Sequence, residues 1–235
     1  MKKITLCLSG LLGIVTLSTA QISIASSDFA NVGDTLYYGS DTTDVTSGIA
    51  LESGTNRTWN ISSAARNEVK SCVFLNPGSS PITAPANITH VMVDGDVQNT
   101  RFLNISSSVM ETVLANPMSA FLGGEAFIRL KSLTFPATYL TQIRDTFKTQ
   151  QIVPAGMIGL SSLADSIRAT LTVKLHNLCD GWGMLITPID SYPVLRFRNR
   201  VTVDVKLEGK KNILPLWINI PLSSLPVPVP SNETN

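Results

Sequence analysis

The sequence predicts an all-β fold, an antiparallel β-sandwich with one or two short helices. Two stretches carry this prediction. Residues 195–207 (L-R-F-R-N-R-V-T-V-D-V-K-L) have apolar side chains at every odd position except Asn199 and polar side chains at every even position. Residues 167–176 repeat the pattern and place His176 on the polar side. Because successive side chains of a strand point to opposite faces, each stretch is expected to bury one face and expose the other to water.

Shorter strands are expected ahead of these two. Runs rich in Val, Ile, Thr and aromatic residues, bounded by turn residues, predict strands at 21–25, 35–38, 49–51, 58–61, 69–75, 90–93 and 126–130. Trp59 is expected to fill the core. Asp94-Gly95-Asp96 is interpreted as a turn, because the further oxygen ligands of a calcium loop are missing from the neighbouring positions.

Three regions in the middle of the chain have sequence features that are typical of a helix. Ser108 and Glu111 have the spacing of a capping box, which predicts a short helix over residues 109–115. Residues 133–148 are ambiguous, since their composition favours a strand while some apolar positions have helical spacing. Residues 153–163 are apolar with two glycines, typical of a buried loop or a short helix.

The last third of the chain is expected to alternate between turns and strands. Turns are predicted at residues 180–183, 188–192 and 208–212, and strands at 184–187 and 213–220. Pro215 suits a strand at the edge of a sheet. Residues 221–235 contain four prolines and predict a flexible tail, which leaves residues 21–220 as the sandwich domain.

The first twenty residues predict a signal peptide. Lys2 and Lys3 precede an apolar run, and the small residues that follow it place the expected cleavage between Ala20 and Gln21. The alternative is an uncleaved anchor, but the run is shorter than the roughly 20 residues that a membrane span needs. We therefore expect a bacterial protein that is secreted, periplasmic or at the cell surface, with no membrane span after signal removal.

The charge of the predicted mature chain is close to neutral. Without Lys2 and Lys3, 16 of the 18 Lys and Arg residues remain against 17 Asp and Glu residues. This balance gives no support to nucleic-acid binding or to polybasic docking on a membrane.

The mature chain would hold two cysteines, Cys72 and Cys179. An even pair in an oxidising compartment predicts a disulfide. Closing a loop of about 100 residues would stabilise the fold by roughly 4 to 5 kcal/mol in the chain-entropy model. The alternative is a pair of buried free thiols.

No catalytic or cofactor motif stands out. The sequence has no G-x-S-x-G elbow, no P-loop and no G-x-G-x-x-G loop, so no cofactor is predicted. The histidines, His90 and His176, are far apart without clustered carboxylates, so no metal site is predicted. The leading hypothesis is a non-enzymatic envelope or extracellular protein with a structural or binding role, whose partner is a surface polysaccharide or another envelope protein.

Two other functions stay open. A carbohydrate- or peptide-binding protein would use Trp182 and Tyr192, which flank the strand expected at 184–187, although a core position is the competing interpretation of Trp182. A secreted hydrolase comes third, because glycosidases need only two carboxylates.

Three stretches resemble a known group of proteins. They are I-S-I-A-S-S-D-F-A-N-V-G-D-T-L-Y-Y at 22–38, T-N-R-T-W-N-I-S at 55–62 and D-G-W-G-M-L-I-T-P-I-D-S-Y-P-V-L-R-F-R at 180–198. Together they are similar to an N-terminal β domain of secreted Bacteroidota proteins that are associated with type IX secretion and are of unknown function. The resemblance implies a secreted β domain, here without the C-terminal sorting domain. Its motifs are turns and strand starts, so they imply no chemistry.

Overall fold

The computed structural model describes residues 22–40, 52–65, 67–116, 119, 126–214 and 216–221. It confirms the all-β prediction, with two packed sheets whose strands pair almost entirely antiparallel. The expected helices are not found in this part of the chain. Helical structure there is limited to Ser119 and to short 3-10 turns, η1 (Ser26–Asp28), η2 (Pro77–Ser79), η3 (Val97–Asn99) and η4 (Ala155–Ile158).

The first sheet has six strands in the order β1-β3-β4-β5-β6-β7, and each strand is antiparallel to its neighbours. The strands are β1 (Thr35–Ser40), β3 (Glu68–Leu75), β4 (His90–Asp94), β5 (Thr100–Ile105), β6 (Val109–Ala115) and β7 (Phe127–Thr134). All but the first connection in this order join strands that follow one another in the chain, so the sheet is largely a meander.

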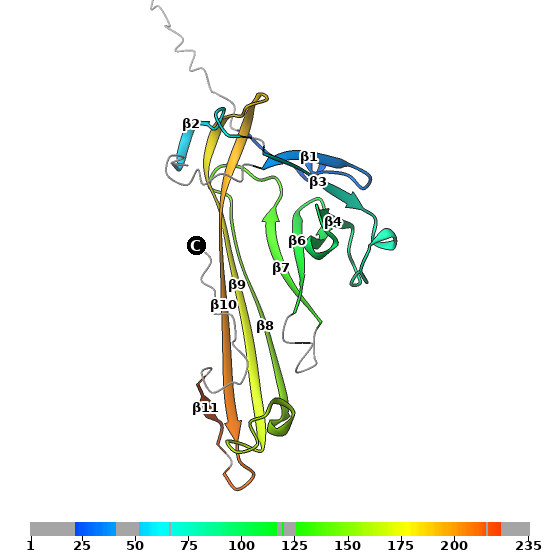
Figure 1. Ribbon diagram of the computed structural model, residues 1–235. Helices are drawn as coiled ribbons and strands as arrows, with labels where there is room; N and C mark the ends of the chain where they lie inside the picture. The colour runs from blue at the N-terminus through cyan, green and yellow to red at the C-terminus, as the bar shows by residue number, and fades with distance from the viewer. Residues whose placement is uncertain are drawn as a thin grey trace, which may run out of the picture.

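The second sheet is built on three long strands, β8 (Gln142–Pro154), β9 (Ser166–Ile186) and β10 (Ser191–Lys210). We call these three strands the arm. β9 lies in the middle, with β10 on one side along its length. On its other side β9 pairs first with β8 and then, in parallel, with β2 (Gly54–Asn60). β11 (Ile218–Ile220) pairs with the end of β10. Figure 1 shows that the arm extends well beyond the six-stranded sheet.

One face of the arm packs against the six-stranded sheet. Leu171, Val173 and Leu175 of β9 are buried against Ile128 and Leu130 of β7. This confirms the alternation predicted for residues 167–176.

Two polar side chains of the arm also bond to the backbone of β7. The Asp145 carboxylate accepts the Lys131 N–H at 2.8 Å, and the Asn177 Nδ2 donates to the Ser132 carbonyl at 2.7 Å. These bonds satisfy backbone groups of the last strand in its sheet and hold the arm against it.

The far end of the arm has a core of its own. It joins η4 and β11 to the ends of the long strands, through Val153, Ala155, Leu160, Ala164, Ile167, Ala169, Leu207 and Ile220. On the opposite face Glu208 binds Arg168 at 2.7 Å and Lys206 at 2.8 Å. The hydrogen bonds from Lys206 and then from Arg168 lower the pKa of Glu208. The Arg168 guanidinium also lies 4.6 Å from the centre of the Trp217 ring.

The helix predicted over residues 109–115 is wrong, because this segment is strand β6. Val113 is fully buried, and the Ser106 hydroxyl accepts the Val109 N–H at 3.0 Å, which closes a β-turn and starts no helix. Glu111 lies opposite Asn104 on β5, whose Nδ2 donates to it at 3.2 Å. The spacing of Ser108 and Glu111, which resembles a capping box, therefore occurs here in a β-hairpin and not at the start of a helix.

The predicted turn at residues 180–183 is also wrong, because β9 runs through it and only shifts register beside Arg196. Residues 133–148 are extended for most of their length, and η4 forms the short helix that was one alternative for 153–163. Trp59 is 5% exposed, which confirms its place in the core.

The long strand at 195–207 is present within β10, but its apolar face is only partly covered. Leu207 is buried, whereas Val201 and Val203 are 37% and 47% exposed. Val201 and Val203 lie on β10, whereas the buried residues that pack against β7 lie on β9, the middle strand of the arm. The predicted signal peptide with its Ala20–Gln21 cleavage site, the predicted strand at 49–51 and the predicted tail after Pro221 lie outside the described residues.

Candidate functional site

Trp182 and Tyr192 lie close in the paired strands but do not share a surface. Trp182 is paired with Leu195, and Tyr192 is paired with Leu185. Paired residues share a face, and residues three apart in a strand point to opposite faces, so the two aromatic side chains project from opposite faces of the β9–β10 ribbon. Tyr192 is 45% exposed and Trp182 is half-buried. A site that uses both rings on one ligand is therefore not formed here.

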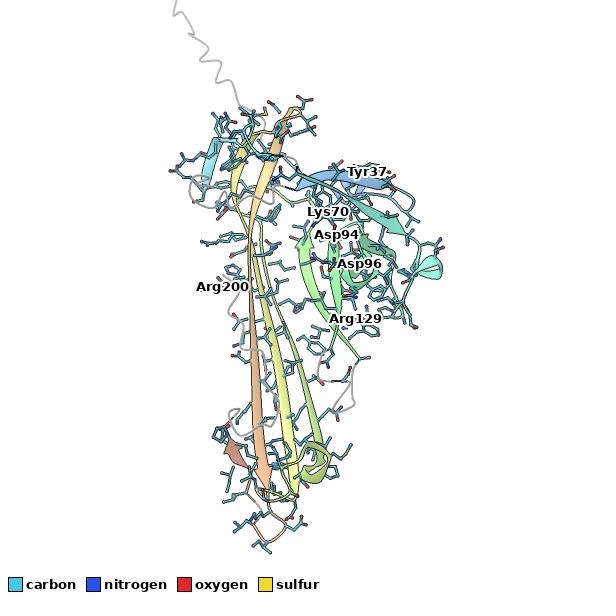
Figure 2. The ribbon with its side chains drawn as sticks, viewed as in Figure 1. Tyr37, Lys70, Asp94, Asp96, Arg129 and Arg200 are labelled. Atoms are coloured by element: carbon cyan, nitrogen blue, oxygen red, sulfur yellow. The ribbon has the colours of Figure 1, made fainter. Side chains whose placement is uncertain are left out.

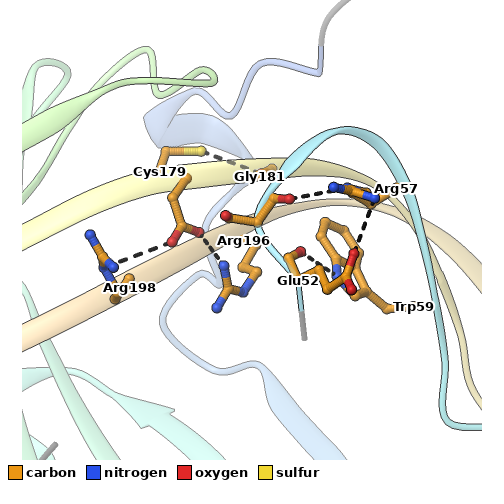
Figure 3. A network of polar contacts seen from close by, with 9 residues as sticks. Glu52, Arg57, Trp59, Cys179, Gly181, Arg196 and Arg198 are labelled. Carbon is orange, nitrogen blue, oxygen red and sulfur yellow. Dashed lines mark hydrogen bonds and ion pairs between the residues drawn. The ribbon is translucent and has the colours of Figure 1, made fainter. Parts of the chain in front are cut away.

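The mostly buried carboxylate of Asp180 lies in the irregular stretch of β9, where the register with β10 shifts. The register shift leaves Asp180 without a backbone pairing partner in β10, and its carboxylate contacts the side chains of Arg196 and Arg198. Arg196 donates to Asp180 at 2.7 Å, and the Arg198 Nε lies 3.8 Å from its other oxygen (Figure 3). Asp180 keeps 11% of its side-chain surface exposed, so the two cations enclose it. The group is an internal ion-pair network.

Two glycines in this stretch let β2 approach β9 closely. A Cβ on Gly183 would lie 1.9 Å from the Arg57 carbonyl oxygen, and one on Gly181 would lie 3.2 Å from the Trp59 ring. Around them the Arg57 Nε donates to the Ser53 carbonyl at 3.0 Å, as Figure 3 shows. The two glycines of the D-G-W-G motif therefore have a packing role, because they leave room for β2 beside β9.

Cys72 and Cys179 are free thiols in the structure, so the predicted disulfide is absent. The physical reason is their placement in different sheets. Cys72 packs with Phe74 and Leu103 in the six-stranded sheet, and the Cys179 thiol lies on β9, 3.7 Å from the Gly181 carbonyl to which it donates. Burial raises the pKa of both thiols, which disfavours the reactive thiolate.

A polar hollow of about 410 Å³ opens on the six-stranded sheet. Its lining includes Lys70, Asp94 and Asp96, which Figure 2 labels together on this sheet. The Tyr38 hydroxyl donates to Asp94, and this hydrogen bond raises the pKa of Tyr38. Sequence reasoning assigned Asp94 and Asp96 to a turn, and the positive φ of Gly95 agrees with that. The hollow is shallow and open to water.

A second, more apolar hollow of about 510 Å³ lies between β7 and β8. Phe127 and Phe147 line it, and Arg129 crosses it to donate to the Ala86 carbonyl. Within the described residues, no three His, Cys, Asp or Glu side chains lie close enough to hold a metal ion. The same part of the chain contains no helix with the length and apolar character needed to span a membrane.

A long surface with many exposed side chains is the face of the arm turned away from the six-stranded sheet, which we call the outer face. Strand pairing aligns its residues in rows of three, one from each strand. From one end to the other, four central rows are Gln142–Leu178–Arg198, Arg144–His176–Arg200, Thr146–Lys174–Thr202 and Lys148–Thr172–Asp204. Figure 2 labels Arg200 on the side of β10 away from β7. The sequence predicts a wet face for the β10 members and for Thr172, Lys174 and His176 of β9. It does not predict one for Leu178 or for the members from β8, because the pairing of β8 is not visible in its own residues.

The chain matches no family model, no curated protein and no solved structure.

Proposed function

We propose that the chain is a secreted, non-enzymatic module of the bacterial envelope or exterior that works by binding, with the arm as its binding element. The observation that carries the proposal is the outer face of the arm. Three strands of 13, 21 and 20 residues form it, and most of its side chains are open to water.

The length of the three strands and the second core at the far end of the arm support a binding role for the arm. A β-strand much longer than the usual 3 to 10 residues leaves backbone and side chains that need further packing. Here the arm continues past the six-stranded sheet and carries a separate core at its far end. That second core keeps the arm ordered where the first sheet does not cover it, so the arm presents a rigid, extended surface.

The proposed location of the protein, in the bacterial envelope or outside the cell, rests on the sequence. The signal-like residues 1–20 favour export, and the resemblance to secreted Bacteroidota β domains favours the periplasm, the cell surface or the exterior alike. An envelope polysaccharide or an envelope protein is then the partner class within reach.

The proposal is tested by retention on envelope material. Purified residues 21–235 are mixed with cell envelopes of the native host, and the fraction that sediments with them is measured. Thr202→Trp places a bulky ring on an exposed position of the outer face without changing charge, and Leu114→Trp does the same on β6 of the other sheet. Retention is expected for the unmodified protein and for Leu114→Trp, and is expected to fall for Thr202→Trp.

The same preparations are assayed for turnover of esters, peptides and glycans. Turnover at enzymatic rates would contradict the proposal and would favour the secreted hydrolase. Absence of retention, or equal loss in both tryptophan variants, would contradict the assignment of binding to the arm.

A further inference from the structure

We infer that the outer face of the arm binds a linear anionic polysaccharide, one that carries carboxylate or sulfate groups along its length. The inference deepens the proposed function and rests on it. Its basis is a concentration of positive charge that the near-neutral composition of the chain does not suggest.

The charge of the four central rows is strongly asymmetric. Five of their twelve side chains are Lys or Arg, and a single one, Asp204, is acidic, so the net charge is +4 with His176 neutral. We call the five cations the cationic patch: Arg144, Lys148, Lys174, Arg198 and Arg200. Residues 21–235 contain 16 Lys and Arg residues against 17 Asp and Glu residues, so the residues outside the four rows carry a net negative charge. Such a local field attracts anions from solution and raises their association rate.

Most of this charge is not neutralised within the protein. All five cations are exposed, Lys174 and Arg198 with 59% and 65% of their side-chain surface. Lys174 forms a loose ion pair with Asp204 at 3.6 Å, and Arg198 lies 3.8 Å from a carboxylate that Arg196 already binds at 2.7 Å. In the part of the chain that the structure describes, no ion pair is formed by the other three members of the patch.

The patch has the dimensions of an extended chain. From Thr172 to Leu178 the strand rises about 20 Å, at roughly 3.3 Å per residue. Arg144 and Arg200 flank His176 in one row, so their backbones are about 10 Å apart, two strand spacings of roughly 4.8 Å. A linear polymer lying along the strands would meet several cations in succession, whereas a small anion would meet one or two.

The neutral residues of the four central rows favour a sugar polymer over the other large polyanions. Thr146, Thr172 and Thr202 lie between the cations and offer hydroxyl groups for hydrogen bonds to sugar hydroxyls. The twelve positions contain no tryptophan, tyrosine or phenylalanine, which single-stranded nucleic acids use for base stacking. Leu178, half-buried, is their one apolar side chain, so the surface lacks the apolar residues that interfacial membrane proteins insert.

The test compares sugar polymers that differ in charge alone. Binding of residues 21–235 to immobilised dextran sulfate and to uncharged dextran is measured by biolayer interferometry from 50 to 300 mM NaCl, and polygalacturonate is the carboxylate probe. We expect binding to dextran sulfate and polygalacturonate that weakens steeply with salt, and none to dextran. Duplex DNA and phosphatidylserine vesicles are run as competing polyanions and are expected to bind more weakly.

Charge reversal locates the site. Arg144→Glu/Arg200→Glu brings the net charge of the four central rows from +4 to zero, so the affinity of this variant for dextran sulfate is expected to fall by about tenfold or more at low salt. Arg144→Lys/Arg200→Lys keeps the charge and should keep most of the affinity. Arg101→Glu/Lys131→Glu makes the same change of net charge at exposed positions of the six-stranded sheet and should have a much smaller effect.

Asp204→Asn is expected to raise the affinity for dextran sulfate, whereas the charge reversals lower it. It removes the single acid of the four rows and breaks an exposed ion pair that contributes little stability, so tighter binding is expected without loss of folding.

Three results would overturn the inference. They are no binding to either charged polymer at 50 mM NaCl, equal losses in the arm and control double variants, and tighter binding of DNA or vesicles than of the sugar polymers. Envelope retention with no affinity for the charged polymers would leave the proposed function standing and reject this ligand, whereas loss of retention in Thr202→Trp and Leu114→Trp alike would reject the arm itself.

Discussion

Shortening Leu171 to alanine removes the side chain on which the contact between the two sheets is centred. Leu171 is 1% exposed and lies in the middle of β9, in the cluster that includes Ile128 and Leu130 of β7. No other residue of that cluster is more completely buried.

The expected magnitude follows from this burial. Leu→Ala changes in protein cores destabilise by about 2 to 5 kcal/mol, the larger values belonging to sites that cannot collapse. Leu171 lies between two sheets that are also held together by the Asp145 and Asn177 hydrogen bonds to β7, so the cavity cannot close easily. We therefore expect a loss in the upper half of that range, about 3 to 5 kcal/mol.

Equilibrium unfolding in urea, followed by tryptophan fluorescence and far-ultraviolet circular dichroism, measures the effect. Leu163→Ala is the matched control, because Leu163 is 49% exposed. It should change the free energy of unfolding by no more than about 0.5 kcal/mol. A loss below about 1 kcal/mol for Leu171→Ala, or equal losses for the two variants, would show that β9 does not pack against β7 as described.

Three further predictions concern single features of the fold. In a protein of residues 21–235, Cys72 and Cys179 should be unreactive toward Ellman's reagent in the native state and yield two thiols in denaturant, because both are buried and unpaired. Gly183→Ala should destabilise the protein, measured by urea unfolding, because its Cβ would collide with the Arg57 backbone. Glu208→Gln should reduce the loss of stability on acidification: the pKa of Glu208 is lowered in the folded state, so its contribution is present at neutral pH and lost as the pH falls through that value.

Each of these has an outcome that contradicts it. No thiols after denaturation without reductant would mean that the cysteines are bridged. A Gly183→Ala protein as stable as the original would mean that β2 does not approach β9 as described. Parallel curves of unfolding free energy against pH for Glu208→Gln and the unmodified protein would mean that the carboxylate has no ionic partner.

The two long strands could be predicted because their alternation spans ten or more residues. In residues 195–207 and 167–176 apolar and polar side chains alternate with a period of two, and a helix does not have that period. The shorter signals were less specific. The capping-box spacing of Ser108 and Glu111 also fits a β-hairpin, and D-G-W-G has the composition of a turn although here it forms a bulged strand beside β2.

The outer face could be predicted only in part, because it depends on strand pairing. Arg198 and Arg200 were placed on a wet face from their own strand. Arg144 and Lys148 join them only because β8 pairs with β9 in one particular register, which places Arg144 beside His176. Residues 133–148 do not show which strand they will pair with, so the patch appears only once the sheet is assembled.

Lysine footprinting with bound polysaccharide reports which surface the ligand covers, and so shows whether the outer face of the arm is the binding site. Acetylation of each lysine is measured by mass spectrometry with and without dextran sulfate. Lys148 and Lys174 on the arm should be protected, while Lys70 and Lys131 on the six-stranded sheet react as before. Protection of Lys70 and Lys131 with unchanged reaction at Lys148 and Lys174 would contradict the account and move the binding surface to the other sheet.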